Sequence, residues 1–129
     1  MTLHRAIVSL GSNLPCSADI IRDAARRLRT VGRQIRWSGV YFGPDDTGRG
    51  PQYANAVMEL ELPVDRQALH EFTRGLEAAA GRTPESKSIG IMPLDIDLVV
   101  WDGQIVDAYD FSRDYFKQGY SLISDDILS

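Results

Sequence analysis

The stretch LDIDLVVW, residues 94–101, decides the fold class because polar and hydrophobic residues alternate along its first half. Successive side chains of a β-strand point to opposite faces of the sheet, so the alternation predicts a strand with Asp95 and Asp97 on one face. The hydrophobic side chains expected to enter a core on the other face are Leu94, Ile96, Leu98 and Val100. The sequence thus predicts a strand that is buried on one face and acidic on the other.

Two carboxylates held this close repel each other unless a positive charge lies between them. A divalent cation supplies such a charge, and a site with only oxygen ligands favours a hard ion such as Mg²⁺. An Asp-x-Asp motif at a strand end is also common as a solvated charged patch, because short motifs often match by chance. On its own, the pair of Asp95 and Asp97 is compatible with a magnesium site or with an exposed acidic patch.

The overall composition is typical of one globular domain spanning residues 1–129, with 43% hydrophobic and 25% charged residues. The net charge of −4 argues against a nucleic-acid partner, and the single cysteine, Cys16, excludes a disulfide framework. The first residues do not resemble a signal peptide, and no apolar run reaches the length of a membrane span. These features predict a cytoplasmic protein that binds neither nucleic acid nor membranes, and they leave protein partners unknown.

Periodic patterns upstream of residues 94–101 predict the other elements. In chain order these are a strand at 6–10, a helix at 17–31, strands at 35–42 and 53–62, a helix capped by Asp65, and the strand at 94–101. The order βαββαβ is that of a ferredoxin-like α+β sheet with its helices packed on one face. The other face is then expected to carry an active site, in which Tyr53 and Asn55 lie beside the two aspartates.

Three connections carry residues that are typical of loops and turns. Residues 43–51 form a polar loop rich in glycine, aspartate and proline, and residues 82–93 form a flexible connection. Asp102-Gly103 favours a tight turn into a short strand at 104–106. We therefore expect a β-hairpin directly after the acidic strand.

Four short motifs, in this order and spacing, resemble those of the 6-hydroxymethyl-7,8-dihydropterin pyrophosphokinases of the folate pathway. They are LGSNL at 10–14, QYANAV at 52–57, Glu77 with Gly81-Arg82, and LDID at 94–97. The resemblance implies a ferredoxin-like fold and a kinase-type transferase reaction, in which a pyrophosphoryl group moves from ATP to the hydroxymethyl oxygen of a reduced pterin. It also implies two Mg²⁺ ions, and phosphoryl transfer needs such ions to neutralise phosphate oxygens.

The resemblance further implies roles for individual residues. The expected catalytic residues are Asp95, Asp97 and Arg82, and the two aspartates are expected to bind the metal. The residues expected to bind the pterin are Tyr53, Asn55, Tyr120, Gly11, Ser12 and Asn13. Those expected to bind ATP are Glu77, Arg82 and Lys87. Tyr120 stands where the family has a phenylalanine that stacks on the pterin, and a packed core aromatic is an equal alternative from the sequence alone.

The chain departs from the family at three phosphate-binding positions. Ser88, Met92 and Gln118 stand where the family has arginines. Arginine makes permanently charged, two-pronged contacts with phosphate that these residues do not replace. Two alternatives to the enzyme therefore stay open: a catalytically weakened paralogue that binds a pterin, and a pyrophosphokinase for a different pterin.

Overall fold

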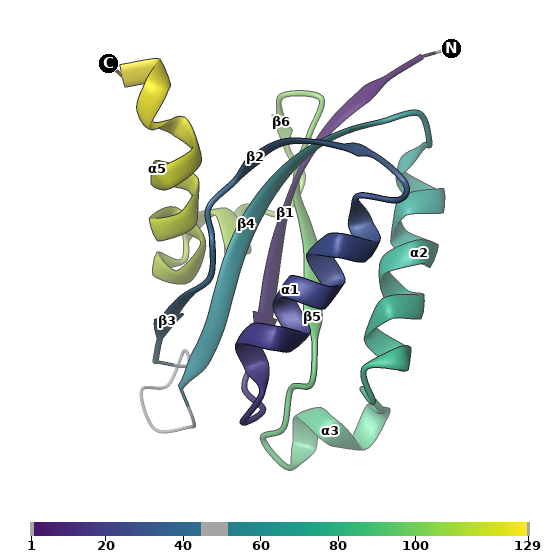
Figure 1. Cartoon of the computed structure of the whole chain (residues 1–129), viewed down its shortest axis with the longest axis vertical. Helices are drawn as coiled ribbons and strands as arrows, with labels where there is room; N and C mark the ends of the chain where they lie inside the picture. The colour runs from purple at the N-terminus through teal and green to yellow at the C-terminus, as the bar shows by residue number, and fades with distance from the viewer. Residues whose placement is uncertain (1, 45–51, 129) are drawn as a thin grey trace.

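The computed structural model of the chain describes residues 2–44 and 52–128, so most of the predicted loop at 43–51 lies outside the described residues (Figure 1). The elements in chain order are β1 (His4–Ser12), α1 (Ser17–Leu28), β2 (Arg33–Trp37), β3 (Tyr41–Gly43), β4 (Tyr53–Leu62), α2 (Arg66–Ala79), α3 (Pro84–Ser88), β5 (Asp95–Trp101), β6 (Gln104–Ile105), α4 (Ala108–Ser112) and α5 (Asp114–Leu128). The predicted α+β class is confirmed. Within the described ranges, no helix is long and apolar enough to cross a membrane.

All pairs of neighbouring strands in the six-stranded sheet are antiparallel, in the order β2-β4-β1-β5-β6, and β3 also pairs with β4. The prediction of a single strand at 35–42 was wrong, because β2 and β3 are separate. Gly39 lies between them with a φ of +77°, a left-handed conformation that interrupts a strand. The Ser38 hydroxyl accepts a hydrogen bond from the Val57 amide at 2.8 Å and thereby holds the bend against β4.

The two predicted helices, α1 and α2, pack on the same face of the sheet (Figure 1). The core beneath them is aliphatic, and its fully buried members include Val8, Leu10, Ile21, Leu28, Met58 and Leu60. Asp65 caps α2 as predicted, since its carboxylate accepts a hydrogen bond from the Ala68 amide at 2.9 Å. The strand alternation of β1 and β4 therefore points its small and aliphatic set toward the helices.

A further helix, α5, covers part of the opposite face of the sheet and has no counterpart in the expected βαββαβ order (Figure 1). The buried residues of this second cluster are Val57, Val99, Val100, Phe116 and Ile123. They come from β4, β5 and α5, so the face that carries Asp95 and Asp97 is partly packed. This packing confines the polar site to the part of the face near the start of β5.

A β-bulge in β5 overturns one detail of the predicted alternation. Ile7 lies opposite Val100 and Val8 lies opposite Leu98, so Val99 is an extra residue on β5. An extra residue reverses the facing of all side chains that follow it. Val100 therefore joins the cluster under α5, and the prediction that it packs with Leu94, Ile96 and Leu98 was wrong.

The hairpin predicted at Asp102-Gly103 is confirmed. Asp102 has a φ of +48° and Gly103 a φ of +81°, which is the pattern of a type I′ turn. Trp101 pairs directly with Gln104 across this turn. Because β6 then ends, the chain leaves the sheet and turns back toward the middle of β5.

The contact between α5 and the sheet depends on the absence of a side chain at Gly119. A Cβ added at Gly119 would overlap the hydroxyl of Tyr41 and the side chain of Val57. We expect Gly119→Ala to lower the free energy of unfolding by about 1–2 kcal/mol, because overpacking outweighs the gain in helix propensity. Chemical denaturation followed by circular dichroism measures this change.

Gly75 provides the matched control, because it is also helical but no atom lies within 4 Å of a Cβ added there. Gly75→Ala is expected to raise the free energy of unfolding by about 0.5–1 kcal/mol. Equal effects of the two substitutions would contradict the close packing of α5 on β4.

Candidate active site

Three neighbouring strands bring predicted site residues into one row. Gly11 of β1 lies opposite Asn55 of β4 on one side and opposite Asp95 of β5 on the other. Directly opposed residues of antiparallel strands point to the same face, so Asn55 and Asp95 share the face that α1 and α2 leave uncovered. Neighbouring strands lie about 4.8 Å apart, so roughly 10 Å separates the two backbones, with only a glycine between them. No side chain from β1 therefore separates the amide from the carboxylate.

The side chain of Asn55 keeps unused hydrogen-bonding capacity. The residue is only 5% exposed. Within the described residues, its side-chain amide makes one long hydrogen bond of 3.5 Å, from Nδ2 to the Tyr53 carbonyl. A Cβ added at Gly11 would lie 3.5 Å from Oδ1 of Asn55, so this oxygen borders the space above Gly11. Buried polar groups are usually partnered, and an amide offers a donor and an acceptor together. Asn55 is thus suited to the edge of a ligand that lies over Gly11.

Arg82 connects two of the predicted carboxylates beside the start of β5. Its Nη1 lies 2.9 Å from Asp95 Oδ1 and 2.8 Å from Glu77 Oε2. The same oxygen of Glu77 accepts a hydrogen bond from the Ile96 amide at 2.8 Å, which attaches α2 to the edge of β5. Burial raises the pKa of Glu77, and the Ile96 amide and Arg82 oppose this rise. The structure therefore joins a predicted metal ligand to two predicted ATP-binding residues.

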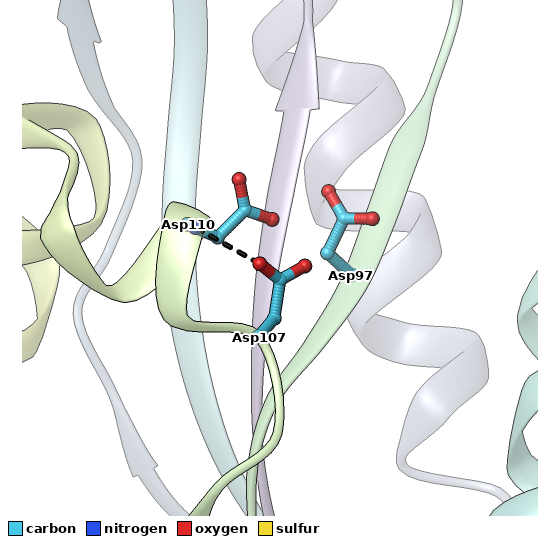
Figure 2. Close-up of side chains that lie close together, drawn as sticks. All are labelled: Asp97, Asp107 and Asp110. Atoms are coloured by element: carbon cyan, nitrogen blue, oxygen red, sulfur yellow. Dashed lines mark hydrogen bonds between the residues drawn. The ribbon is translucent and has the colours of Figure 1, made fainter.

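A second group of carboxylates surrounds Asp97 (Figure 2). One oxygen atom from each of Asp97, Asp107 and Asp110 lies within 4.8 Å of the others. After the hairpin, the Asp107 amide donates a hydrogen bond to the Val99 carbonyl at 3.4 Å, which brings the chain back to β5. Asp107 then caps α4 by accepting a hydrogen bond from the Asp110 amide at 3.0 Å. This cap places the buried carboxylate of Asp110 beside Asp97.

The acidic cluster is electrostatically strained when no cation is bound. Burial raises the pKa of Asp97, and the nearby carboxylates of Asp95 and Asp110 raise it further. Burial also raises the pKa of Asp110, although a hydrogen bond from the Tyr115 hydroxyl lowers it. Carboxylates packed in this way need a proton or a cation between them at neutral pH. Because every donor atom is an oxygen, the cluster fits a hard divalent cation such as Mg²⁺.

A cleft of about 1100 Å³ runs along the edge of β5 and is walled by α2 and α3. Its lining includes Asp95 and Asp97 of β5 together with Glu77, Arg82 and Lys87. Pockets for small molecules commonly have volumes of about 300–1,000 Å³, so the cleft has room for a nucleotide. The residues predicted to bind metal and those predicted to bind ATP therefore border one space.

The first loop is held in place by a buried side chain and a hydrogen-bonded side chain. Ser12 is fully buried and lies opposite Ala54, whose side chain faces α1, so the Ser12 hydroxyl points away from the row of Asn55 and Asp95. The Asn13 side chain donates to the Gly90 carbonyl and accepts from the Met92 amide, both at 2.8 Å. Asn13 therefore ties the first loop to the connection between α2 and β5.

Tyr120 packs within the second hydrophobic cluster. Its ring centroid lies 5.4 Å from that of Phe111 and 5.5 Å from that of Phe116. This environment matches the alternative of a core aromatic. The ring is only partly buried, and a stacking role on the pterin stays a prediction.

The connection at 82–93 is partly helical, since it contains α3, which begins at Pro84 and is preceded by a capping box at Thr83. At two of the positions without the family's arginines, the Ser88 hydroxyl donates to the Glu85 carbonyl at 2.8 Å and the Met92 side chain is buried. Gln118 is exposed on α5.

Sequence reasoning missed Asp107 and Asp110 as site residues. The available signal was weak: an Asp-x-x-Asp spacing directly after the predicted hairpin, which is also typical of an ordinary helix cap. Only the return of the chain to β5 shows that these carboxylates meet Asp97.

The part of the chain that matches known proteins includes every residue of this site. Residues 7–122 match the family model described as 7,8-dihydro-6-hydroxymethylpterin-pyrophosphokinase (HPPK). The chain is also similar to a Pseudomonas putida protein named 2-amino-4-hydroxy-6-hydroxymethyldihydropteridine pyrophosphokinase. The two are 30% identical over 105 residues, which make up 80% of this chain and 87% of the relative. The residues matched by the family model include the row across the strands, the acidic cluster and the cleft.

Proposed function

Because the chain belongs to the 7,8-dihydro-6-hydroxymethylpterin-pyrophosphokinase family, we propose that it transfers the pyrophosphoryl group of ATP to the hydroxymethyl group of 6-hydroxymethyl-7,8-dihydropterin. The hydroxymethyl oxygen attacks the β-phosphorus and loses its proton, the bond from that phosphorus to the α,β-bridging oxygen breaks, and AMP leaves. The observation that carries this proposal is the row of Asn55, Gly11 and Asp95, which supports a heterocycle and an acidic metal site side by side.

The magnesium ligands in this proposal are Asp95 and Asp97, and the number of ions is two. Burial and the carboxylate neighbours raise the pKa of Asp97, and Asp107 and Asp110 bring two further carboxylate oxygens within 4.8 Å of it, so these observations support a cation beside Asp97. When bound, Mg²⁺ neutralises phosphate oxygens whose charge develops during the transfer. Asp95, which Arg82 contacts at 2.9 Å, would hold the metal with its carboxylate, and Arg82 would add positive charge beside the phosphates.

The pterin in this proposal lies over Gly11. Asn55 offers its amide to the donor and acceptor groups of the heterocycle edge, and Tyr53 borders the same space. Asn13 holds the first loop in place, so its contribution is positioning. This arrangement directs the hydroxymethyl group toward Asp95 and the cleft.

ATP in this proposal occupies the cleft along β5, with its phosphates toward Asp95 and Asp97. Arg82 and Lys87 contact the phosphates, and Glu77 fixes Arg82 through their ion pair of 2.8 Å. Because the reaction consumes ATP, we also propose that the protein works in the cytoplasm.

A pterin-binding protein without turnover is the second candidate function. It is favoured by one observation: the three arginine positions hold Ser88, Met92 and Gln118, while Arg82 is engaged by Glu77 and Asp95. Calorimetry separates the two candidates, because an enzyme of this kind should bind pterin more tightly when a magnesium-bound ATP analogue is present. The second candidate predicts the same pterin affinity with and without the analogue.

AMP formation tests the proposed function directly. We expect AMP to appear only when ATP, Mg²⁺ and 6-hydroxymethyl-7,8-dihydropterin are all present, and to equal the amount of pyrophosphorylated pterin formed. Chromatography of the nucleotides measures both products. A panel of other hydroxymethyl pterins in the same assay identifies the preferred substrate, and the absence of AMP with every pterin would reject the enzyme.

A further inference from the structure

The cationic side chains of this chain are unevenly paired. In the described ranges, the arginines of α1, β1 and β2 form ion pairs or hydrogen bonds with neighbouring side chains, as does Arg82. The described cationic side chains that form no hydrogen bond or ion pair are Arg66, Arg74, Lys87 and Lys117. Of these, Arg66, Arg74 and Lys87 line the cleft along β5. Unpaired positive charge is therefore gathered in the space where the proposed function needs it.

Arg74 is the best placed of these cations. It lies three residues before Glu77 on α2, and residues at this spacing lie on the same side of a helix. Glu77 faces the edge of β5, because it accepts the Ile96 amide at 2.8 Å. Arg74 lies about 4.5 Å further along the axis of α2, and one strand residue spans about 3.3 Å. Because α2 and β5 run in opposite directions (Figure 1), this step along α2 corresponds to about one residue of β5 from Ile96 toward Asp97, and Arg74 and Asp97 both line the cleft.

We propose that Arg74 contacts the polyphosphate chain of ATP and supplies positive charge that the family places at the positions of Ser88, Met92 and Gln118. This inference rests on the proposed function and adds to it a residue that the family motifs do not include. A guanidinium carries a permanent charge and binds phosphate oxygens with two donors, so one arginine on α2 replaces part of the lost contact. Together with Lys87, it offsets the acidic side of the cleft around Asp97.

The test is the binding of magnesium-bound α,β-methylene-ATP, whose α,β bridge resists cleavage, to the intact protein by isothermal titration calorimetry. We expect Arg74→Ala to weaken this binding about 10- to 30-fold, which is typical for loss of a charge-assisted hydrogen bond. Adenosine has no phosphate, so its affinity should change less than about twofold. Arg74→Lys keeps the charge but loses the two-donor geometry of the guanidinium. Its affinity for the analogue should lie between those of the wild type and Arg74→Ala.

Arg66→Ala is the matched control. Arg66 is also unpaired, lies on the same helix and lines the same cleft, but it is about 12 Å from Arg74 along the helix axis. Its removal should weaken binding of the analogue less than about threefold. Thermal denaturation should show that both variants are as stable as the wild type, because neither side chain forms a hydrogen bond or ion pair within the described residues.

Three results would overturn the inference: equal losses for Arg74→Ala and Arg66→Ala, equal losses for adenosine and the analogue, or no loss for Arg74→Ala. In each of these cases the wild type still binds the nucleotide, so the proposed function stands. If the wild type binds neither the analogue nor the pterin, the proposed function fails and this inference fails with it. The two failures are therefore distinguishable in one set of titrations.

Discussion

Replacing Asp97 with asparagine is expected to lower kcat/KM for AMP formation by about 10³-fold, because phosphoryl transfer depends on cations that neutralise the phosphate oxygens. Asparagine keeps the shape of the side chain and removes the charge that holds the metal. Steady-state kinetics at saturating Mg²⁺ and ATP measures the loss. Asp19→Asn on α1 is the control, since Asp19 is 86% exposed and pairs only with Arg22 in the described structure. A loss below about tenfold for Asp97→Asn would contradict the metal-binding role.

The same substitution is expected to stabilise the metal-free protein at alkaline pH. Burial, with Asp95 and Asp110 nearby, raises the pKa of Asp97 to about 9. Between the ordinary pKa of 3.8 and this raised value, the unfolded chain releases a proton that the folded protein retains. The stability contributed by Asp97 is therefore complete below the ordinary pKa and decreases as pH rises through this window. An asparagine side chain does not titrate, so Asp97→Asn should lose this pH dependence.

Thermal denaturation in the presence of a chelator, at pH 5 and at pH 8, measures this difference. The midpoint of the wild type should fall more than that of Asp97→Asn between the two pH values. Adding Mg²⁺ at pH 8 should raise the midpoint of the wild type and leave that of the variant nearly unchanged, because ligands that bind only the folded state stabilise it. A variant that is less stable than the wild type at pH 8 without metal would show that Asp97 is structural.

Replacing Arg82 with alanine is expected to lower kcat/KM by about 10³-fold and also to destabilise the fold. The activity falls because a guanidinium that neutralises transferred phosphate is worth about 10³–10⁵ in rate in comparable enzymes. The free energy of unfolding should fall by about 1–2 kcal/mol, since Glu77 and Asp95 lose their common partner at a partly buried site. Kinetics and urea denaturation give the two values.

Arg82→Lys separates these two effects. Lysine keeps the positive charge between Glu77 and Asp95 but lacks the planar guanidinium with its two parallel donors. The free energy of unfolding should therefore be nearly restored, while kcat/KM stays well below that of the wild type. If Arg82→Lys restores the full rate, a simple counter-charge is sufficient and the guanidinium has no special role. If Arg82→Ala retains the full rate, Arg82 is only a structural partner of the two carboxylates.

The sequence predicted the parts of the site that depend on local spacing. Asp95 and Asp97 share a face because β-strand side chains alternate, and Asn55 shares that face because the alternation of β4 is equally regular. The turn at Asp102-Gly103 was predictable for the same reason, since its backbone conformation depends on the residues themselves. The resemblance of four short motifs identified the family, and the comparisons support it.

The sequence predicted that Asn55 and Asp95 share a face, but it could not predict the other contacts between these strands and distant segments. Val100 changed faces because a bulge adds one residue to β5, and a bulge depends on the packing of both strands. Asp110 meets Asp97 because a hairpin and a helix cap return the chain to β5. Arg74 faces the cleft because α2 is fastened to β5 through Glu77.

The amino-acid sequence by itself therefore determined most of the strands, the helices α1 and α2, the acidic pair and the family of this chain. The tertiary structure alone decided the electrostatics of the site, namely which cations are paired and how many carboxylates surround Asp97. The physical reason is range: alternation and turn conformation arise between adjacent residues, whereas charge interactions depend on distances between segments that only folding brings together.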